Sequence, residues 1–329
     1  MRKWNLLLGA LISLLCLALA FAGVEWRRAG EALGRGDWRY FLPAGVAILG
    51  YLLARASRWR ILLRGRVGLV DAFSLINIGY LISNVLPFRL GDPARAVAVS
   101  FDGKVKLSTA LSTVVVERVL DMLTVVLLLA VTVPFVDEAD WTRQAGLLGG
   151  GVGLIVIVAL VWLALRPELG RRVLRWGLGR LPSIENDRWL EWFDGLVEGL
   201  EALRSPRQAA GLIAWSITTW VLTVGHYLAI LGAFIEQPKV VEASFLTAAT
   251  GLGMALPSAP GAMGVFHSVA RYALQLPFGV AAETAVVVAF AAHTFQYVIM
   301  CMLGLVGLLQ QNVSFAQLRA DATATVAKE

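Results

Sequence analysis

The segment of residues 84–95, NVLPFRLGDPAR, combines helix breakers with charged side chains that could bind an anion. Asp92 is a favoured N-cap residue and Pro93 suits the first position of a helix, so free backbone N–H groups are expected here. Such a helix start attracts anions, and Arg89 and Arg95 could add bidentate contacts to a phosphate. We predict a phosphate site; the simpler alternative is an interfacial loop whose arginines meet lipid headgroups nonspecifically. The candidate residues of this site are Asn84, Pro87, Arg89, Gly91, Asp92 and Arg95.

A second cluster places three charges inside a long apolar run, at Glu117, Arg118 and Asp121. A charge near the bilayer centre costs at least about 2.5–3.5 kcal/mol on insertion scales, so these side chains need partners or a wet cavity. On a helix, Glu117 and Asp121 share a face, and Arg118 can pair with Asp121. We interpret the cluster as a cavity wall where a lipid headgroup, or a proton coupled to its movement, is exchanged. An internal ion network that holds helices together is the alternative.

The third cluster, residues 256–272 (LPSAPGAMGVFHSVARY), is rich in residues that break helices. Exposed backbone groups are tolerated at membrane depth only where the segment is buried in protein or lines a cavity. His267 and Arg271 are four residues apart and can face the same side of a helix. A close helix contact would explain Gly264 but not the whole segment. The candidate site residues are Pro257, Pro260, Gly261, Gly264, His267 and Arg271.

The remaining polar residues indicate neither a metal site nor a cofactor. His226 and His293 lie in separate apolar runs without ligand spacing, so we interpret them as core histidines with hydrogen-bond partners. No Walker motif is present, so ATP hydrolysis by this chain is not expected. No nucleophile and base pair stands out, and we nominate no catalytic residue.

The elements that position these clusters must be membrane helices. The chain of 329 residues is 58% hydrophobic and 16% charged, with a mean hydropathy of +0.70. Several apolar runs reach the roughly 20 residues that a helix needs to cross a bilayer, and none alternates like a barrel strand. The formal charge of +6 is spread over loops, so it reports topology, and no nucleic-acid partner is expected. These features predict an all-α polytopic membrane protein.

The apolar runs are not equivalent. Two of them, 69–87 and 243–257, end at helix breakers, and we interpret each as one arm of a re-entrant helical hairpin. About six full crossings remain. The distribution of Lys and Arg places both termini, residues 55–66 and residues 166–207 on the cytoplasmic side, with residues 25–39 outside against the charge bias. The apolar runs lie near residues 4–24, 40–54, 69–87, 107–135, 145–165, 208–234, 243–257, 262–276 and 283–309.

A single transmembrane domain is expected over residues 1–329. Its first apolar run has the charged start and the Ala20-Phe21-Ala22 ending of a signal peptide, but we expect it to stay as the first transmembrane helix because the topology needs that crossing. Within the domain, residues 166–207 mix charges with tryptophans at spacings compatible with an amphipathic helix in the membrane interface. We favour a cytoplasmic or interfacial connector over a lipid-sensing role for this segment.

A short pattern occurs twice in the chain. Leu-Pro-x-x-x-Gly lies at residues 86–91 and again at residues 256–261, each time at the tip of a predicted re-entrant element. The predicted topology has the first hairpin enter from inside and the second from outside. This arrangement is typical of inverted-topology repeats, whose broken helices meet near the bilayer midplane around a substrate site. We therefore predict an inverted repeat.

Three motifs, taken in their order along the chain, resemble the flippase-like transmembrane region of the lysylphosphatidylglycerol synthase family. They are N-x-x-L-P-x-R-x-G-D-x-x-R, E-R-x-x-D and P-S-A-P-G-A-M-G-V-F. The resemblance covers essentially the whole chain and implies a role in moving lipids between leaflets. His267 stands where the family pattern has an acidic residue, so proton coupling through this position is not carried over. We expect a stand-alone membrane member without the soluble synthase domain. The cargoes that the resemblance implies are an anionic phospholipid, a polyprenyl-phosphate, a glycolipid or a hopanoid.

We predict a protein of the bacterial cytoplasmic (inner) membrane that translocates a lipid or lipid-linked anion, and that is a transporter rather than an enzyme. The headgroup would enter between the two hairpins while the acyl tails stay in lipid. One alternative is a membrane-embedded transferase that acts on a lipid-linked substrate, with Glu117 or Asp121 as general base. Another is a noncatalytic scaffold that holds a lipid-modifying enzyme through residues 166–207.

Overall fold

The computed structural model describes residues 3–86, 90–101, 103, 105–136, 162, 166–178, 189–190, 193–194, 197, 205–254 and 258–311. In this part of the chain every regular element is a helix and no strand occurs. The all-α class predicted from the sequence is confirmed. Nearly all of the apolar run 145–165, predicted to cross the membrane, lies outside the described residues.

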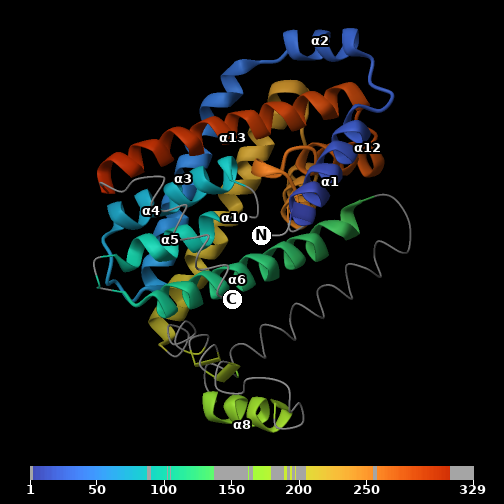
Figure 1. The fold of residues 1–329 in the computed structure, drawn as a ribbon. Coiled ribbons are helices and arrows are strands. Elements are labelled where there is room, and N and C mark those ends of the chain that lie inside the picture. The colour runs from blue at the N-terminus through green and yellow to red at the C-terminus, as the bar shows by residue number, and fades with distance from the viewer. Residues whose placement is uncertain are drawn as a thin grey trace.

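Most of the helices follow the apolar runs of the sequence, whereas α2, α5 and α8 lie outside them (Figure 1). Helix is the expected state of an apolar segment in lipid, because it satisfies every backbone polar group within the segment. The α-helices are α1 (Lys3–Phe21), α2 (Trp26–Gly34), α3 (Phe41–Leu62), α4 (Leu69–Val85), α5 (Gly91–Ser100), α6 (Leu107–Thr132), α8 (Pro167–Leu178), α10 (Pro206–Phe234), α11 (Val240–Gly253), α12 (Val265–Phe278) and α13 (Ala282–Gln311). Short 3-10 turns are η1 (Trp38–Tyr40), η3 (Val133–Phe135) and η5 (Pro260–Ala262).

Three of the described helices are long and apolar enough to cross a membrane: Trp38–Leu62, which joins η1 and α3, together with α10 and α13. A fourth span is possible if α1 and α2, which meet at a bend of 81°, count as one. Helix α6 has 26 residues but carries three charges in its middle. The length and apolar character of these helices agree with a multi-pass membrane protein.

Helix α3 continues beyond the predicted end of its apolar run. The run was expected to stop at residue 54, which left Arg55 and Arg58 in a cytoplasmic stretch. That boundary is wrong, because α3 extends to Leu62 and both arginine side chains are buried within the fold. The helix can continue because carboxylates on α6 compensate the two charges.

The two larger hydrophobic cores of the described residues centre on two sets of helices. The first core is built on α3 to α6 and includes Leu52 and Ile78, and the second is built on α10 to α13 and includes Leu246 and Val288. Packing within the sets corresponds helix by helix: α3 on α4, α4 on α5 and α5 on α6, as α10 on α11, α11 on α12 and α12 on α13. The sets join where α3 lies along α10, α4 packs on α13 and α11 packs on α6. The second half of the chain therefore repeats the packing order of the first.

The innermost helices of each set are short. Helices α4 and α5 have 17 and 10 residues, and α11 and α12 have 14 each. At 1.5 Å per residue, none of them reaches across a hydrocarbon core of about 30 Å. In each pair the two short helices pack on each other, α4 on α5 and α11 on α12.

Two predicted site glycines serve the packing of these short helices. A Cβ at Gly91, the first residue of α5, would lie 1.8 Å from the carbonyl oxygen of Gly79 in α4. Gly264, which precedes α12, has a φ of +85°, and a Cβ there would lie 2.1 Å from the carbonyl oxygen of Ser13 in α1. Backbone atoms cannot give way as a flexible side chain can, so only glycine fits at these two contacts.

Candidate functional site

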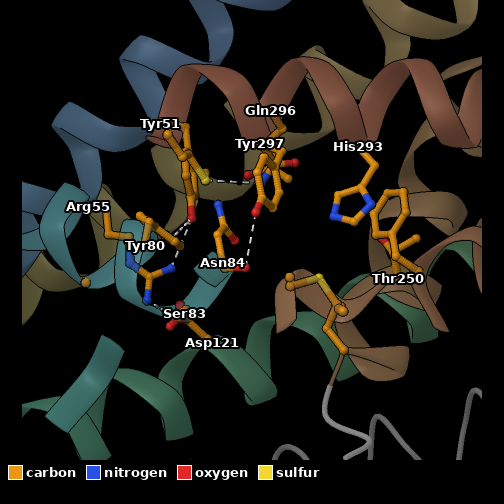
Figure 2. A pocket seen from close by; sticks show the side chains of 18 of the residues that line it. Tyr51, Arg55, Tyr80, Ser83, Asn84, Asp121, Thr250, His293, Gln296 and Tyr297 are labelled. Carbon is orange, nitrogen blue, oxygen red and sulfur yellow. Dashed lines mark hydrogen bonds and ion pairs between the residues drawn. The ribbon is translucent and has the colours of Figure 1, made fainter. Parts of the chain in front are cut away.

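A cavity of about 770 Å³ lies between the two helix sets. Figure 2 shows its walls: α13 carries Gln296, Tyr297 and His293 on one side, and Asp121 of α6 lies on the other. Helices α3, α4 and α5 line one part of the cavity, and α10, α11 and the turn η5 line another part. A concave space of this size falls in the range of small-ligand pockets.

Four arginines and three carboxylates form an ion network at one end of the cavity, here called the arginine cluster. Its members are Arg55, Arg58, Asp92, Arg95, Glu117, Arg118 and Asp121. They come from α3, α5 and α6, so three helices of the first set must pack together to build it.

Glu117 is the centre of the arginine cluster. Its side chain is fully buried, and it forms an ion pair with Arg55 and accepts a hydrogen bond of 3.1 Å from Nη1 of Arg95. Asp121, one turn further along α6, accepts from Nη2 of Arg58 at 2.7 Å and from Nη2 of Arg55 at 3.2 Å. The two carboxylates share a helix face, as the sequence predicts, and that face meets arginines from α3 and α5.

Arg118 and Asp92 form a second contact between α5 and α6. Nε and Nη2 of Arg118 donate to the two oxygens of Asp92 at 2.8 and 2.9 Å, a bidentate pair. One expectation is corrected here: Asp92 is not an N-cap, because α5 already begins at Gly91 and the Asp92 carboxylate faces Arg118 instead. Arg118 also forms the predicted pair with Asp121, at the longer distance of 3.8 Å.

The arginine cluster carries one more positive than negative charge among its described members. Not every guanidinium N–H is used: Nε of Arg58 and Nε of Arg95 are buried without a hydrogen-bond partner in the described part of the chain. The Arg95 guanidinium also lies over the ring of Trp59, 4.8 Å from its centroid. A buried excess of cationic charge is unfavourable in a membrane protein unless an anion balances it.

Two tyrosines line the cavity next to the arginine cluster. The hydroxyl groups of Tyr51 in α3 and Tyr80 in α4 contact each other, and Nη1 of Arg55 donates to the Tyr51 hydroxyl at 3.1 Å. Both rings line the cavity together with Arg55 (Figure 2). Their contacts hold Arg55, which pairs with both Glu117 and Asp121.

The structure brings about half of the predicted site residues together at the cavity. Glu117 lies directly behind them, in contact with the arginines. Gly91, Gly264, His267 and Arg271 lie outside the lining. Pro87, Arg89 and Pro257 lie outside the described residues. The lining residues among those predicted are Asn84, Asp92, Arg95, Arg118, Asp121, Pro260 and Gly261.

Arg271 and His267 make contacts that hold α12 in place. Nη1 of Arg271 donates to the carbonyl oxygens of Leu19 and Ala20, at 2.9 and 3.0 Å, in the last turn of α1. Nε2 of His267 lies 3.3 Å from Nδ1 of His293, and its ring stacks on Phe290. These contacts connect α12 with α1 and α13. Both residues therefore have a structural role that does not require a bound ligand.

Sequence reasoning missed Arg55 and Arg58 as site residues. Two signals were present in the sequence. Tyr51, Arg55 and Arg58 have the spacing of one helix face, and the charged residues of α6 needed partners. The uncharged lining residues on α10, such as Trp220 and His226, carried no comparable signal because Trp and His are common in apolar helices.

Comparison with known proteins gives two distant relatives. The chain is 26% identical to a protein named Glycosyltransferase AglD from Haloferax volcanii, over 95% of this chain and 55% of that protein. It is also 26% identical to a UPF0104 membrane protein from Methanothermobacter thermautotrophicus, over 73% of this chain and 76% of that protein. The chain thus spans about half the length of the first relative. No solved structure matches it.

The family assignment rests on a match that covers most of the chain. Residues 6–304 match the family described as the lysylphosphatidylglycerol synthase TM region, and this stretch contains every described residue that lines the cavity. The resemblance seen in the sequence motifs is therefore confirmed: the chain belongs to the family of the lysylphosphatidylglycerol synthase transmembrane region.

Proposed function

We propose that this protein translocates a lipid with an anionic headgroup between the leaflets of the bacterial cytoplasmic membrane. The observation that carries the proposal is the arginine cluster, which faces a cavity between membrane helices with an excess of one positive charge. A phosphate is the lipid group that would balance this charge. Arginine is suited to hold it, because its planar fork can donate two hydrogen bonds at once.

The geometry fits a headgroup in the cavity with its tails outside. About 770 Å³ is enough for a phosphate and the group attached to it, but acyl or polyprenyl chains would have to remain in the bilayer. Arg95 lines the cavity, and its Nε–H has no hydrogen-bond partner in the described part of the chain, so it can offer the headgroup a hydrogen bond. Binding there would be charge-assisted and would exclude water from the phosphate.

Alternating access follows from an inverted repeat, which we propose for α3 to α6 and α10 to α13. The equivalent packing of the two sets supports it, as does the position of the cavity between them. In this arrangement the pairs α4–α5 and α11–α12 are re-entrant hairpins, and about six other segments cross the membrane. Rocking of one set against the other would open the cavity to each leaflet in turn.

A transferase acting on a lipid-linked substrate is the second candidate, because one relative is named a glycosyltransferase. The match covers 55% of that protein, so the named activity does not have to reside in the matched part. Glu117 and Asp121, the residues expected to act as base, are each engaged by two or more arginines. A base would have to break these ion pairs to accept a proton, so the arrangement favours transport.

The test is exchange of fluorescent lipids between leaflets of proteoliposomes, measured by chemical quenching of the outer leaflet. Wild-type protein is expected to move a phosphate lipid well above the rate in protein-free liposomes. Arg55→Gln is expected to lower this rate by about tenfold or more, because it removes a charge-assisted contact. Arg60→Gln is the matched control, since Arg60 lies on the same helix but is exposed.

Arg55→Lys separates charge from hydrogen-bond geometry. Lysine keeps the charge but not the fork, so an intermediate rate is expected. Equal rates for wild type, Arg55→Gln and Arg60→Gln would contradict the proposal. Covalent change of the labelled lipid, detected by mass spectrometry, would favour the transferase instead.

A further inference from the structure

The part of the cavity that faces the arginine cluster is polar but uncharged. Among the described lining residues, none of those from α10 to α13 is Asp, Glu, Lys or Arg. This uncharged wall is built chiefly from one face of α10 and one face of α11. Its polar members on these two helices include Thr219, Trp220, Thr223, His226, Thr247 and Thr250.

Two buried nitrogen atoms of the uncharged wall have no hydrogen-bond partner in the described part of the chain. They are Nε1 of Trp220 and Nε2 of His226. Nδ1 of His226 lies 3.3 Å from the carbonyl oxygen of Ala44, which can only accept, so the neutral ring carries its proton on Nδ1 and leaves Nε2 as an acceptor. Trp220 contributes a donor. Buried polar atoms are rarely left without partners, so this pair points to a ligand with hydroxyl groups, which can both donate and accept.

The threonines of the wall add further acceptors. Hydroxyls of Thr219 and Thr223 donate to backbone carbonyl oxygens one turn back on α10, at 2.7 and 2.8 Å. Thr247 and Thr250 do the same on α11, both at 2.7 Å. Each hydroxyl proton is therefore used, while the oxygen can still accept from a ligand. A wall of this kind suits a group with several hydroxyl donors.

A cationic headgroup would find no counter-charge in this cavity. The described carboxylates of the lining are Asp92 and Asp121, and both are already paired with arginines. An ammonium group would lose its water here without gaining a carboxylate, next to a cluster with excess positive charge. An uncharged polar group does not need a counter-charge, so it can bind in this cavity without leaving a charge unpaired.

We infer that the headgroup accepted by this cavity joins a phosphate to an uncharged, hydroxyl-rich ring such as a sugar. The inference rests on the proposed function: the arginine cluster holds the phosphate and the uncharged wall holds the ring. The indole of Trp220 lines the cavity from α10, its six-membered ring lies near Gly251 of α11, and its buried N–H has no partner in the described part of the chain. Trp220 is thus a specificity residue for the ring and not for the phosphate.

The experiment uses the full chain in proteoliposomes and compares three phosphate lipids with the same acyl chains. Phosphatidylglucose carries a sugar, phosphatidylmethanol has no ring, and phosphatidylethanolamine carries an ammonium group. Phosphatidylglucose is expected to exchange about tenfold faster than either of the others, because only it pairs the buried donor and acceptor. A glucosyl phosphate on a polyprenol, tested in parallel, shows whether the natural source is a glycerolipid or an isoprenoid.

Trp220→Phe keeps an aromatic ring and removes the donor. It is expected to lower phosphatidylglucose exchange about fivefold and to leave phosphatidylmethanol exchange unchanged. Trp215→Phe is the matched control, because Trp215 lies on the same helix but does not line the cavity. If Trp220→Phe does not reconstitute, Thr223→Val tests the same wall with the same expectation.

The outcomes separate the inference from the proposed function. If phosphatidylmethanol, phosphatidylethanolamine and phosphatidylglucose exchange at equal rates above the protein-free background, transport stands and the inference is wrong. If none of the four lipids exchanges above background, the proposed function fails. If Trp220→Phe slows phosphatidylmethanol as much as phosphatidylglucose, Trp220 does not select the ring and the inference is also overturned.

Discussion

Helices α6 and α13 are the last helices of the two sets and line the same cavity, but α6 brings charged side chains to it and α13 brings uncharged ones. α6 presents Arg118 and Asp121, whereas α13 presents His293, Gln296 and Tyr297 (Figure 2). The charges on α6 are tolerated because α3 and α5 supply arginines that meet them. On α13, the polar groups bond to neutral partners, as when the Tyr297 hydroxyl donates to the carbonyl oxygen of Asn84 at 3.2 Å.

Two helices that line one cavity therefore need not carry side chains of the same polarity. Each helix can carry only the polar groups for which its neighbours provide partners, since unpaired charges are costly in a membrane. The asymmetry gives the cavity one cationic end and one neutral wall. A ligand with an anionic part and an uncharged polar part would use both.

The largest effect is expected for Glu117→Gln, which tests whether the charges on α6 depend on their partners from α3 and α5. This isosteric change removes the carboxylate that Arg55 and Arg95 share, and it leaves buried guanidinium groups without compensation. We expect a loss of about 3–5 kcal/mol in the free energy of unfolding. Unfolding of purified protein in detergent by heat or denaturant measures it.

Glu31→Gln is the control for this change, because Glu31 pairs with Arg27 on the exposed helix α2. An exposed pair contributes at most about 1 kcal/mol. Equal effects of the two substitutions would show that the arginine cluster does not hold α3, α5 and α6 together.

A second prediction compares the short helices of the two sets through their tight glycines. Gly91→Ala would place a Cβ against the backbone of Gly79, and Gly264→Ala would place one against the backbone of Ser13. Each is expected to cost about 1–3 kcal/mol in unfolding free energy through overpacking, and the positive φ adds strain at Gly264. Thermal unfolding measures both.

Gly30→Ala is the matched control, because a Cβ at this helical position meets no atom within 4 Å. It is expected to leave stability unchanged or to raise it slightly. If Gly91→Ala were as well tolerated as Gly30→Ala, α4 and α5 could not pack as closely as the structure has them.

The smallest expected effect concerns the ion pair between Arg118 and Asp92. Its side chains are 44% and 22% exposed, so water weakens the attraction in spite of the bidentate geometry. A double-mutant cycle with Arg118→Gln and Asp92→Asn is expected to give a coupling energy of about 1 kcal/mol. A coupling near zero would mean that this ion pair does not help to hold α5 against α6.

Much of the fold and part of the site could be predicted from the sequence. The apolar runs gave the helices, because hydrophobic length and backbone hydrogen bonding are local properties of a segment. The charges of Glu117 and Asp121 on one helix face required partners, and this pointed to the right helix for the site. The end of α3 was harder to predict from the sequence, because Arg55 follows the end of an apolar run but is buried in the packed structure.

By itself, the sequence determined a helical membrane protein with buried charges and with breakers at two places. Only the tertiary structure decided which charges meet. Arg55 and Glu117 are 62 residues apart, and Asp92 and Arg118 are 26 apart, so neither pair follows from helix periodicity. The same holds for Trp220 and His226, whose nitrogen atoms lack partners only because of how α10 packs. The physical reason is that pairing depends on which helix faces come together in space, while periodicity describes one helix at a time.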